Sequence, residues 1–288
     1  MMHEGTIVAV HGRQYRVELA SGGLLLCFPR GKKSELACGD HVQVERSSDT
    51  QGVITAIMPR SSLLYRSNEF KQKLIAANVA QIIVVVAADP PFSDELVTRC
   101  IVAAESQNVA TLIVFNKCDL ADRVEPGMMA LAPFEKLGYQ VLRISARHDV
   151  DALRPYLSGR TSVLVGQSGM GKSTLINAFF PDANTPTREI SVALRSGKHT
   201  TTHATLYRFD AQSSLIDSPG LQEFGLRHLP PSTIEHGFLE FRPLLGQCRF
   251  RNCLHNREPG CAVLSAVRQG DIDPRRYAAF RSLVGEAG

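Results

Sequence analysis

Short strands separated by turn-forming residues make up the first 65 residues of the chain. The breaks between them carry Gly, Asp and Ser, which are typical of turns. The predicted strands are Ile7 to Val10, Gln14 to Leu19, Leu24 to Phe28, His41 to Glu45 and Val53 to Ile57. Five strands in this span predict a small β-barrel of the oligonucleotide-binding (OB) type, with a Src-homology-like barrel as the alternative.

From about residue 70 the pattern changes to short apolar runs alternating with amphipathic stretches. Most of the runs lack period-two alternation, as expected for parallel strands covered on both faces. The clearest helix is Asp94 to Ser106, with Ser93 as its N-cap. Strands alternating with helices predict a doubly wound α/β domain. The runs are Ile82 to Ala88, Thr111 to Phe115, Val141 to Ile144, Ser162 to Val165 and Ser214 to Ile216.

Past about residue 229 the composition shifts again. Pro230 and Pro231 break the preceding pattern, an Arg- and Cys-bearing segment follows, and a last helix is predicted from Pro274 to Val284. The predicted fold is a multidomain α/β protein with domains at residues 1–65, 66–228 and 229–288. The longest apolar run has seven residues, far short of the roughly 20 that cross a bilayer. No membrane association is expected, and the absence of a readable signal peptide predicts a cytoplasmic location.

The net positive charge of the chain is concentrated in one segment. The chain has 288 residues, 44% of them hydrophobic, and a formal net charge of +4, which excludes disordered and fibrous classes. Between Arg242 and Gly288 there are eight Arg, no Lys and four acids, so this segment carries the whole positive excess. A basic segment of this kind favours a nucleic-acid partner.

A phosphate-binding loop is indicated by residues 166–173, G-Q-S-G-M-G-K-S, which follow the strand ending at Val165 and precede an apolar helical start. Its glycines let backbone N–H groups converge on phosphate oxygens at a helix N-terminus. Lys172 is expected to reach the β and γ phosphates, and Ser173 to ligate Mg²⁺.

Two polar segments downstream have the character of nucleotide switches. Asp217 ends an apolar strand and is followed three residues later by Gly220, so Asp217 is expected to hold Mg²⁺ and the Gly220 N–H to sense a γ-phosphate. In residues 197–202 a Thr hydroxyl is expected to reach Mg²⁺. Thr201 is preferred and Thr200 is the alternative, because three consecutive threonines do not fix the register.

A base-reading motif precedes the phosphate loop in the chain. Residues 116–119 read N-K-C-D at the end of a buried strand, and the Asp119 carboxylate can accept both N1–H and N2–H of guanine, which adenine does not offer. About 25 residues later, Ser145 and Ala146 end another strand, where the Ala146 N–H is expected to meet the guanine O6. These residues predict GTP rather than ATP.

The motifs are similar to the five signature motifs of translation-factor-type GTPases, but in a permuted order that begins with the base motif. That order, between a small barrel and a Cys/His segment, resembles the ribosome small subunit-dependent GTPase A family. The resemblance implies a circularly permuted GTPase with an N-terminal OB fold, acting late in assembly of the small ribosomal subunit. It implies GTP-binding positions at Asn116, Lys117, Cys118, Asp119, Ser145, Ala146, Gly166, Gln167, Ser168, Gly169, Met170, Gly171, Lys172, Ser173, Thr174 and Gly220.

The Gln that orients the attacking water in many GTPases has no counterpart at the usual position, so another residue must orient this water. Leu221 stands where many GTPases place the Gln that orients the attacking water. The resemblance points to His199, whose imidazole can orient or deprotonate water, while the alternative leaves His199 in contact with phosphate or solvent. His199, Lys172 and Thr201 are therefore the predicted catalytic residues.

A metal site is indicated by Cys248, Cys253, His255 and Cys261, three thiols and an imidazole within 14 residues. Four such ligands complete the tetrahedral coordination of a structural Zn²⁺ and leave no open position. The resemblance supports the same four residues, and buried or stray thiols are the alternative. The small C-terminal domain is accordingly expected to bind zinc and to include helices.

Three functional hypotheses follow. The first is a GTP hydrolase, with Mg²⁺, whose barrel and zinc module bind rRNA through Arg30, Lys32 and Lys33 on the barrel and Arg249, Arg251 and Arg257 beside the metal ligands. The second is an RNA-binding assembly scaffold in which GTP gates affinity and hydrolysis is incidental. The third is a P-loop kinase or ATPase, against which Asn116 and Asp119 argue. A monomer is expected.

Overall fold

The N-terminal strands close into a barrel. The computed structural model describes residues 2–31, 35–67, 72–181, 204–218 and 226–286. Strand β1 pairs with both β2 and β4, β3 pairs with β5 in parallel, and β4 pairs with β5, so the order β1-β2-β3-β5-β4 returns to β1. This confirms the predicted five-stranded OB-type barrel. Its strands are β1 (Met2–His11), β2 (Gln14–Leu19), β3 (Leu24–Pro29), β4 (His41–Arg46) and β5 (Gln51–Ile57).

Alternation along the barrel strands fills the interior with aliphatic side chains. Along β2, for example, Val17 and Leu19 are buried while Arg16 and Glu18 between them are less so. The strands approach closely at Gly52, where an added Cβ would lie 2.6 Å from Val44 Cγ1. The barrel core is therefore separate from the rest of the protein; it comprises Ile7, Tyr15, Val17, Leu19, Leu25, Cys27, Leu36, Val42, Val44 and Ile54.

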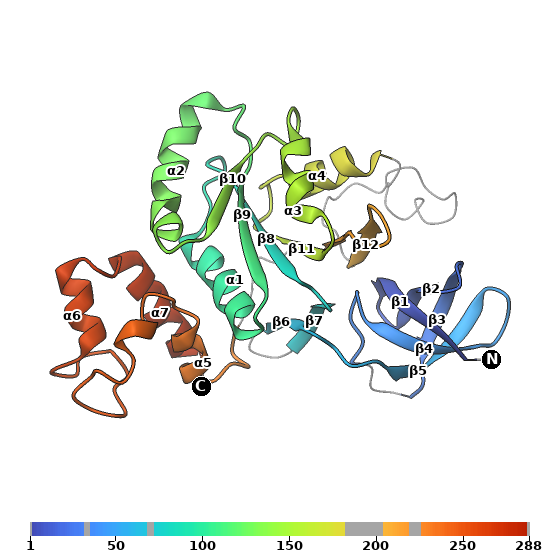
Figure 1. Ribbon diagram of the computed structural model, residues 1–288, viewed down its shortest axis with the longest axis horizontal. Coiled ribbons are helices and arrows are strands. Elements are labelled where there is room, and N and C mark those ends of the chain that lie inside the picture. Colours follow the sequence, from blue (N-terminus) through green and yellow to red (C-terminus); the bar gives the residue numbers. More distant parts are fainter. Residues whose placement is uncertain (1, 32–34, 68–71, 182–203, 219–225, 287–288) are drawn as a thin grey trace.

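A six-stranded sheet forms the centre of the molecule (Figure 1). The strand order is β10-β9-β8-β11-β13-β12; the first five strands are parallel, and β12 is antiparallel to β13. Every residue of β8 is buried, as expected for a strand covered on both faces. The strands are β8 (Gln81–Val86), β9 (Ala110–Phe115), β10 (Gln140–Arg143), β11 (Thr161–Val165), β12 (Thr205–Arg208) and β13 (Ser214–Asp217).

Helices cover both faces of this sheet, which confirms the doubly wound arrangement. Ile82 and Val84 of β8 share a core with α1 (Asp94–Ser106) and α2 (Ala121–Lys136). The intervening Ile83 and Val85 instead pack in a second core, whose helical side chains are those of η1 (Val150–Leu153), α3 (Arg154–Leu157) and α4 (Lys172–Phe179). The period of two along the strand thus divides its side chains between two helical layers.

Helix α1 begins where the sequence predicts. The Ser93 side chain accepts a hydrogen bond from Leu96 N–H at 3.3 Å, which satisfies one of the free donors at the helix start. A cap of this kind depends on local residues alone. This is why the predicted start was correct to the residue.

Contacts from β1 and β2 attach the barrel to the central sheet. β1 meets β12 at Ala9 and Thr205, and an ion pair joins Glu18 of β2 to Arg208 of β12. A hairpin that the sequence did not predict, β6 (Leu63–Ser67) and β7 (Gln72–Ala77), lies between the two bodies. At the end of β7, the Ala77 N–H donates a hydrogen bond to the carbonyl of Cys38, in the barrel segment between β3 and β4, at 2.8 Å.

The C-terminal segment packs against α1 rather than forming a separate core. It contains α5 (Pro231–His236), η3 (Arg242–Leu244), α6 (Ala262–Gln269) and α7 (Pro274–Glu286), and Figure 1 shows these helices beside α1, at the end of the molecule away from the barrel. Phe238, Phe241 and Phe280 belong to the same buried cluster as the side chains of α1. No described helix has the length and hydropathy that a membrane span requires.

Several arginines of this segment hold it in place. Arg242 pairs with Glu105, and Arg275 with Asp94. Arg276 is 3% exposed; it pairs with Glu240 at 2.7 Å and donates to Thr98 Oγ1 at 2.8 Å. The expectation that the whole charge excess forms one nucleic-acid-facing surface is therefore wrong for these three residues, because the acids that neutralise them come from α1 and from the segment itself.

Replacing Arg276 by Ala should lower the free energy of unfolding by about 3–5 kcal/mol, because Glu240 would keep a buried charge without its partner. Urea unfolding followed by circular dichroism measures this. Arg268→Ala is the control, since Arg268 is exposed and has no partner among the described residues; its effect should stay within about 0.5 kcal/mol. Equal effects of the two substitutions would contradict the role given to Arg276.

Candidate nucleotide and metal sites

The predicted phosphate loop joins the end of β11 to the start of α4. Gly166, Gly169 and Gly171 have φ values of 147°, 82° and 96°, which side chains rarely tolerate. An added Cβ would lie 2.3 Å from the Val85 carbonyl oxygen at Gly166, and 2.2 Å from Asn116 Nδ2 at Gly171. Glycine is therefore required both by the turn and by its close neighbours. The loop leads directly into α4 (Lys172–Phe179), and the first N–H groups of a helix have no acceptor within it and favour an anion.

Lys172 folds back across this loop. Its Nζ donates to the carbonyls of Gly166 at 2.6 Å and Gln167 at 2.8 Å. Burial lowers the pKa of Lys172, and the nearby Asp217 carboxylate partly offsets this. The parallel register places Asp217 beside Leu164, two residues before the loop. A cation and a carboxylate thus meet at the same strand ends, as binding of a phosphate with a divalent cation requires.

The buried Asn116 amide connects three of the predicted motifs. Asn116 is 2% exposed. Its Nδ2 donates to the Met170 carbonyl in the phosphate loop at 2.8 Å, and its Oδ1 accepts from Ala146 N–H at 2.9 Å. The structure therefore brings the base motif, the Ser-Ala motif and the phosphate loop together, although they lie up to 54 residues apart in the chain.

Asp119 points a charged carboxylate towards solvent at this edge. It is exposed, and Ser145 Oγ donates to its Oδ1 at 2.6 Å. That hydrogen bond is the main reason why the pKa of Asp119 is lowered. Asp119 therefore stays ionised at neutral pH and keeps acceptor capacity for two N–H groups of a base. Cys118, by contrast, directs its thiol to the Phe115 carbonyl at 3.4 Å.

The loop that follows β8 forms another wall of this site, which the sequence did not reveal. Lys117 donates from Nζ to the Asp89 carbonyl at 2.6 Å, and Ser93 N–H donates to Gln167 Oε1 at 2.8 Å. Pro90 lies 3.2 Å from the position of a Cβ added at Gly169. The run D-P-P-F-S directly after a buried strand was the available signal, since strand ends of α/β sheets gather at ligand sites.

The remaining predicted nucleotide residues fall into two groups. Ser173 and Thr174 lie exposed in the first turn of α4, where their hydroxyls are accessible. His199, Thr200, Thr201, Gly220 and Leu221 lie outside the described residues.

The four predicted metal ligands come together. Their ligand atoms all lie within 4.8 Å of one another. Cys248 Sγ is 3.8 Å from Cys261 Sγ, and His255 Nδ1 is 3.6, 3.6 and 3.2 Å from the sulfurs of Cys248, Cys253 and Cys261. A tetrahedron with metal–sulfur bonds of about 2.3 Å has sulfur–sulfur edges of about 3.8 Å. The cluster therefore has the size and donor set of a tetrahedral metal site.

Backbone N–H groups donate to two of these sulfurs. Leu264 N–H donates to Cys261 Sγ and Ala262 N–H to Cys248 Sγ, each at 3.4 Å, at the N-terminus of α6. Burial acts to raise the pKa of Cys261, but the hydrogen bonds from Leu264 N–H and neighbouring ligands outweigh it and lower the pKa. Burial raises the pKa of Cys253 to about 12, so in this cluster the thiolate is favoured at Cys261. A thiolate is the form of Cys that binds metal.

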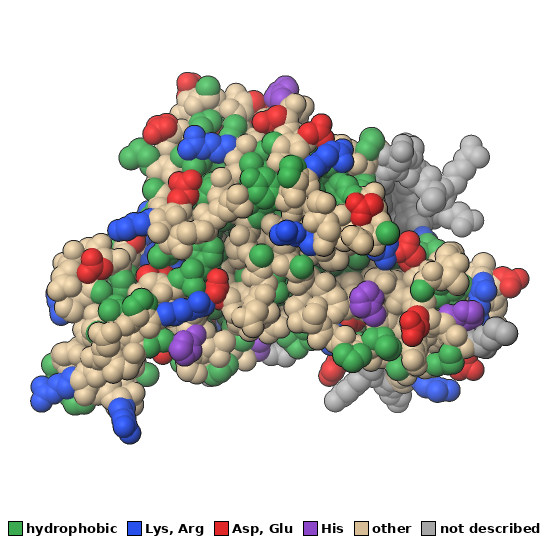
Figure 2. All heavy atoms as spheres, viewed as in Figure 1, with side chains coloured by type: hydrophobic (Ala, Val, Ile, Leu, Met, Phe, Trp, Pro, Cys, Tyr) green, Lys and Arg blue, Asp and Glu red, His purple; other side chains and the backbone are tan. Residues whose placement is uncertain are grey.

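An exposed surface surrounds the metal cluster. Figure 2 shows basic side chains projecting from this end of the molecule, at the lower left of the view. Phe250 is 42% and Leu254 61% exposed, and the Arg249 guanidinium lies 5.5 Å from the centre of the Phe250 ring. Arg30 is exposed on the barrel, whereas Lys32 and Lys33 lie outside the described residues. The exposed arginines of the metal loop are Arg249, Arg251 and Arg257.

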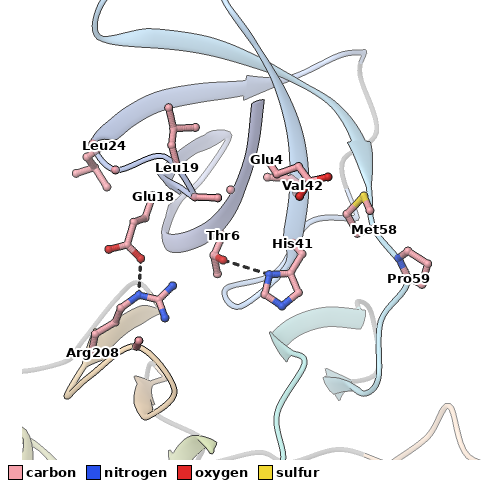
Figure 3. Close-up of a pocket in the computed structure, with 15 residues that line it drawn as sticks. Glu4, Thr6, Glu18, Leu19, Leu24, His41, Val42, Met58, Pro59 and Arg208 are labelled. Atoms are coloured by element: carbon pink, nitrogen blue, oxygen red, sulfur yellow. Dashed lines mark hydrogen bonds and ion pairs between the residues drawn. The ribbon is translucent and has the colours of Figure 1, made fainter. Parts of the chain in front are cut away.

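A hollow of about 870 Å³ lies between the barrel and β12. Figure 3 shows its two polar contacts, the Arg208–Glu18 ion pair and the hydrogen bond between Thr6 and His41. The described residues that line it include none of the predicted nucleotide or metal residues. The hollow therefore lies at the boundary between the barrel and the central sheet, and the Arg208–Glu18 ion pair spans this boundary.

Comparisons with known proteins find one GTPase family that the chain resembles over most of its length. The sequence model of the RsgA GTPase family matches residues 57–227. The small ribosomal subunit biogenesis GTPase RsgA of Nitrosospira multiformis is 52% identical over 280 residues, 97% of this chain and 90% of that protein. The protein of the same name from Burkholderia pseudomallei is 51% identical over 289 residues, 99% of this chain and 92% of that protein.

Two solved structures share the whole architecture. YjeQ from Thermotoga maritima has a TM-score of 0.74 and 29% identity, covering 100% of this chain and 99% of its own. YloQ, described as a circularly permuted GTPase, has a TM-score of 0.71 and 26% identity, covering 100% and 95%. The permuted order predicted from the motifs is thereby confirmed.

Gly171→Ala should destabilise the nucleotide-free protein more than Gly159→Ala does, by about 1–3 kcal/mol. Both glycines have positive φ, 96° and 69°, so both substitutions strain the backbone. Only at Gly171 does the new Cβ meet a buried side chain, that of Asn116; at Gly159 nothing lies within 4 Å. Denaturant titration without nucleotide measures the difference, and equal stabilities would show that the loop does not press on Asn116.

Proposed function

Because the chain belongs to the RsgA GTPase family, we propose that it hydrolyses GTP in the biogenesis of the small ribosomal subunit. The observation that carries this proposal is the Asn116 amide, which bonds to both the phosphate loop and Ala146, with the ionised Asp119 open beside it. A guanine base is the ligand that this arrangement selects. The P-loop kinase and ATPase hypothesis has no support from it.

The nucleotide would bind along the strand ends from Asp119 to Asp217. Asp119 and the Ala146 N–H would recognise the base, and the loop amides with Lys172 would hold the phosphates. Ser173, Thr201 and Asp217 would hold Mg²⁺, which would neutralise part of the phosphate charge. Phosphate would take over the Lys172 hydrogen bonds that the Gly166 and Gln167 carbonyls now accept. The proposed GTP-binding residues are those predicted from the sequence.

His199 is proposed to orient the attacking water. Leu221 cannot do so, because an aliphatic side chain neither donates nor accepts a hydrogen bond. An imidazole on the first switch can accept a proton from water next to the γ-phosphate. With Lys172 and Thr201, His199 completes the proposed catalytic group.

One structural Zn²⁺ is proposed for the cluster of three cysteines and one histidine. Three thiolates and an imidazole suit zinc, and four protein ligands leave no position for catalysis. The ion would hold together the loop of residues 248–261, whose side chains include the exposed Phe250 and Leu254. The metal would thus support a binding surface rather than the hydrolytic reaction.

Binding to rRNA is proposed for the two ends of the molecule. Arg249, Arg251 and Arg257 are exposed around the metal site, and Arg30 is exposed on the barrel, where they would contact phosphates. We accordingly assign residues 1–65 to an RNA-binding barrel, 66–228 to the GTPase domain and 229–288 to an RNA-contacting zinc domain. The protein would act as a monomer on small-subunit particles in the cytoplasm.

The alternative hypothesis is an RNA-binding scaffold in which GTP controls affinity and hydrolysis is incidental. Leu221 is the observation that favours it, because intrinsic hydrolysis should be slow without the usual Gln. Stimulated hydrolysis distinguishes the enzyme from this scaffold.

GTP hydrolysis should increase on addition of purified small ribosomal subunits, and ATP hydrolysis should not. Lys172→Ala should abolish the stimulated activity, because it removes the cation that faces the phosphates. Release of inorganic phosphate measures the hydrolysis of GTP and of ATP. Lys136→Ala, which replaces an exposed Lys on α2, is the control. Subunit binding without stimulation would favour the scaffold, and equal use of ATP would exclude both hypotheses.

His199→Ala should reduce single-turnover GTP hydrolysis by about 100-fold or more while GTP affinity stays within about twofold. The imidazole is assigned to the water and not to nucleotide binding. Rapid-quench measurements give the rate, and titration with a fluorescent GTP analogue gives the dissociation constant. An unchanged single-turnover rate would remove His199 from the mechanism.

A further inference from the structure

A carboxylate from a distant segment contacts the imidazole of the metal cluster. Glu235 lies in α5, 20 residues before His255, and its Oε1 is hydrogen-bonded to His255 Nε2. The side chains are 23% and 5% exposed, so the contact is largely shielded from water. Partial burial of a carboxylate is costly without a partner, and among the described residues the His255 imidazole supplies one.

The two ring nitrogens of His255 have different neighbours. Nδ1 faces all three sulfurs, at 3.2–3.6 Å, whereas Nε2 faces Glu235. A ligating nitrogen must carry no proton, and a neutral imidazole has one proton to place. With Nδ1 turned to the metal, that proton belongs on Nε2, where the carboxylate accepts it.

Other contacts position the ring without determining where its proton lies. His255 has a φ of 53°, and Tyr277 donates from its hydroxyl to the His255 carbonyl at 2.7 Å. The rings of Phe241 and Phe280 lie 6.2 and 6.1 Å away, centre to centre. None of these groups bonds Nε2. Among the described residues, Glu235 alone is hydrogen-bonded to that nitrogen.

The carboxylate also connects the metal loop to the nucleotide domain. Glu235 stands between Ile234, which is fully buried, and the end of α5. Gly237, at the C-cap of α5, approaches α1 so closely that an added Cβ would lie 2.8 Å from Val102 Cγ1. The helix that holds His255 in place is therefore itself seated on α1.

We propose that Glu235 is a positioning residue of the metal centre, which holds His255 in the Nε2-protonated tautomer with Nδ1 directed at the ion. Glu235 would not itself be a ligand of the ion. The inference rests on the zinc site proposed above and adds to it the residue that makes the imidazole a ligand of fixed orientation. Loss of this carboxylate should weaken the metal site while leaving all four ligands in place.

The test compares zinc affinity in full-length Glu235→Ala, Glu235→Gln and wild-type protein by competition with a chelating dye. Zinc should bind about 10–100-fold more weakly to Glu235→Ala than to wild type. The zinc affinity of Glu235→Gln should lie between those of Glu235→Ala and wild type, because an amide oxygen is a weaker acceptor than a carboxylate. Asp271→Asn removes one negative charge from an exposed position of the same segment and should match wild type. Wild-type affinity in Glu235→Ala would overturn the proposal.

A second background separates positioning from general support of the fold. His255→Cys replaces the imidazole by a thiolate that has no N–H to donate, so adding Glu235→Ala to it should not weaken zinc binding further. If the same loss persists in this background, Glu235 acts only through packing of α5, and the proposal fails. Substitution of cobalt for zinc, with its visible absorption bands, reports whether each variant keeps tetrahedral coordination.

Wild-type protein provides a test that needs no variant. In the zinc-loaded protein, nitrogen–proton correlation spectra of the histidine rings should show His255 with its proton on Nε2 and the metal on Nδ1. The opposite tautomer would overturn the proposal even with zinc bound. A wild-type protein that binds no zinc would instead refute the metal site itself, and GTP hydrolysis, assayed separately, would remain a distinct question.

Discussion

The candidate nucleotide site depends on the buried Asn116 amide. Its nitrogen donates to the phosphate loop and its oxygen accepts from the Ala146 N–H, so it links the segments that follow β9, β10 and β11. A buried amide that lost either partner would leave polar atoms without hydrogen bonds, at a cost of about 1–3 kcal/mol each. The same contact explains why Gly171 tolerates no Cβ.

This constraint also explains how a permuted chain retains a working GTPase architecture. Asn116 acts across the spatial order β10-β9-β8-β11, and that order does not depend on where the chain starts. The permutation instead changes which segment follows β13 in the chain. The chain proceeds to α5, and α5 and α7 return to α1, whose N-cap Ser93 is bonded through its N–H to Gln167 of the phosphate loop. One helix therefore contacts the nucleotide loop at its start and the C-terminal segment along its length.

Local patterns in the sequence predicted much of this structure. The bounds of β2 and α1 agree to the residue, because side-chain alternation and an N-cap are properties of neighbouring residues. The β6–β7 hairpin was missed, since its two short runs carry no strong turn signal. The basic C-terminal segment was overinterpreted: charge counted along the chain does not reveal that Arg242, Arg275 and Arg276 are neutralised by acids.

The sequence by itself indicated the chemistry proposed for the protein: a phosphate loop of eight consecutive residues, a carboxylate suited to reading guanine, and four candidate metal ligands within 14 residues. The tertiary structure decided how these groups are held. Asn116 meets Met170 across 54 residues, Glu235 meets His255 across 20, and Arg208 meets Glu18 across 190. Such partners lie far apart in the chain and share no period or motif, so only the packing of strands and helices brings them together.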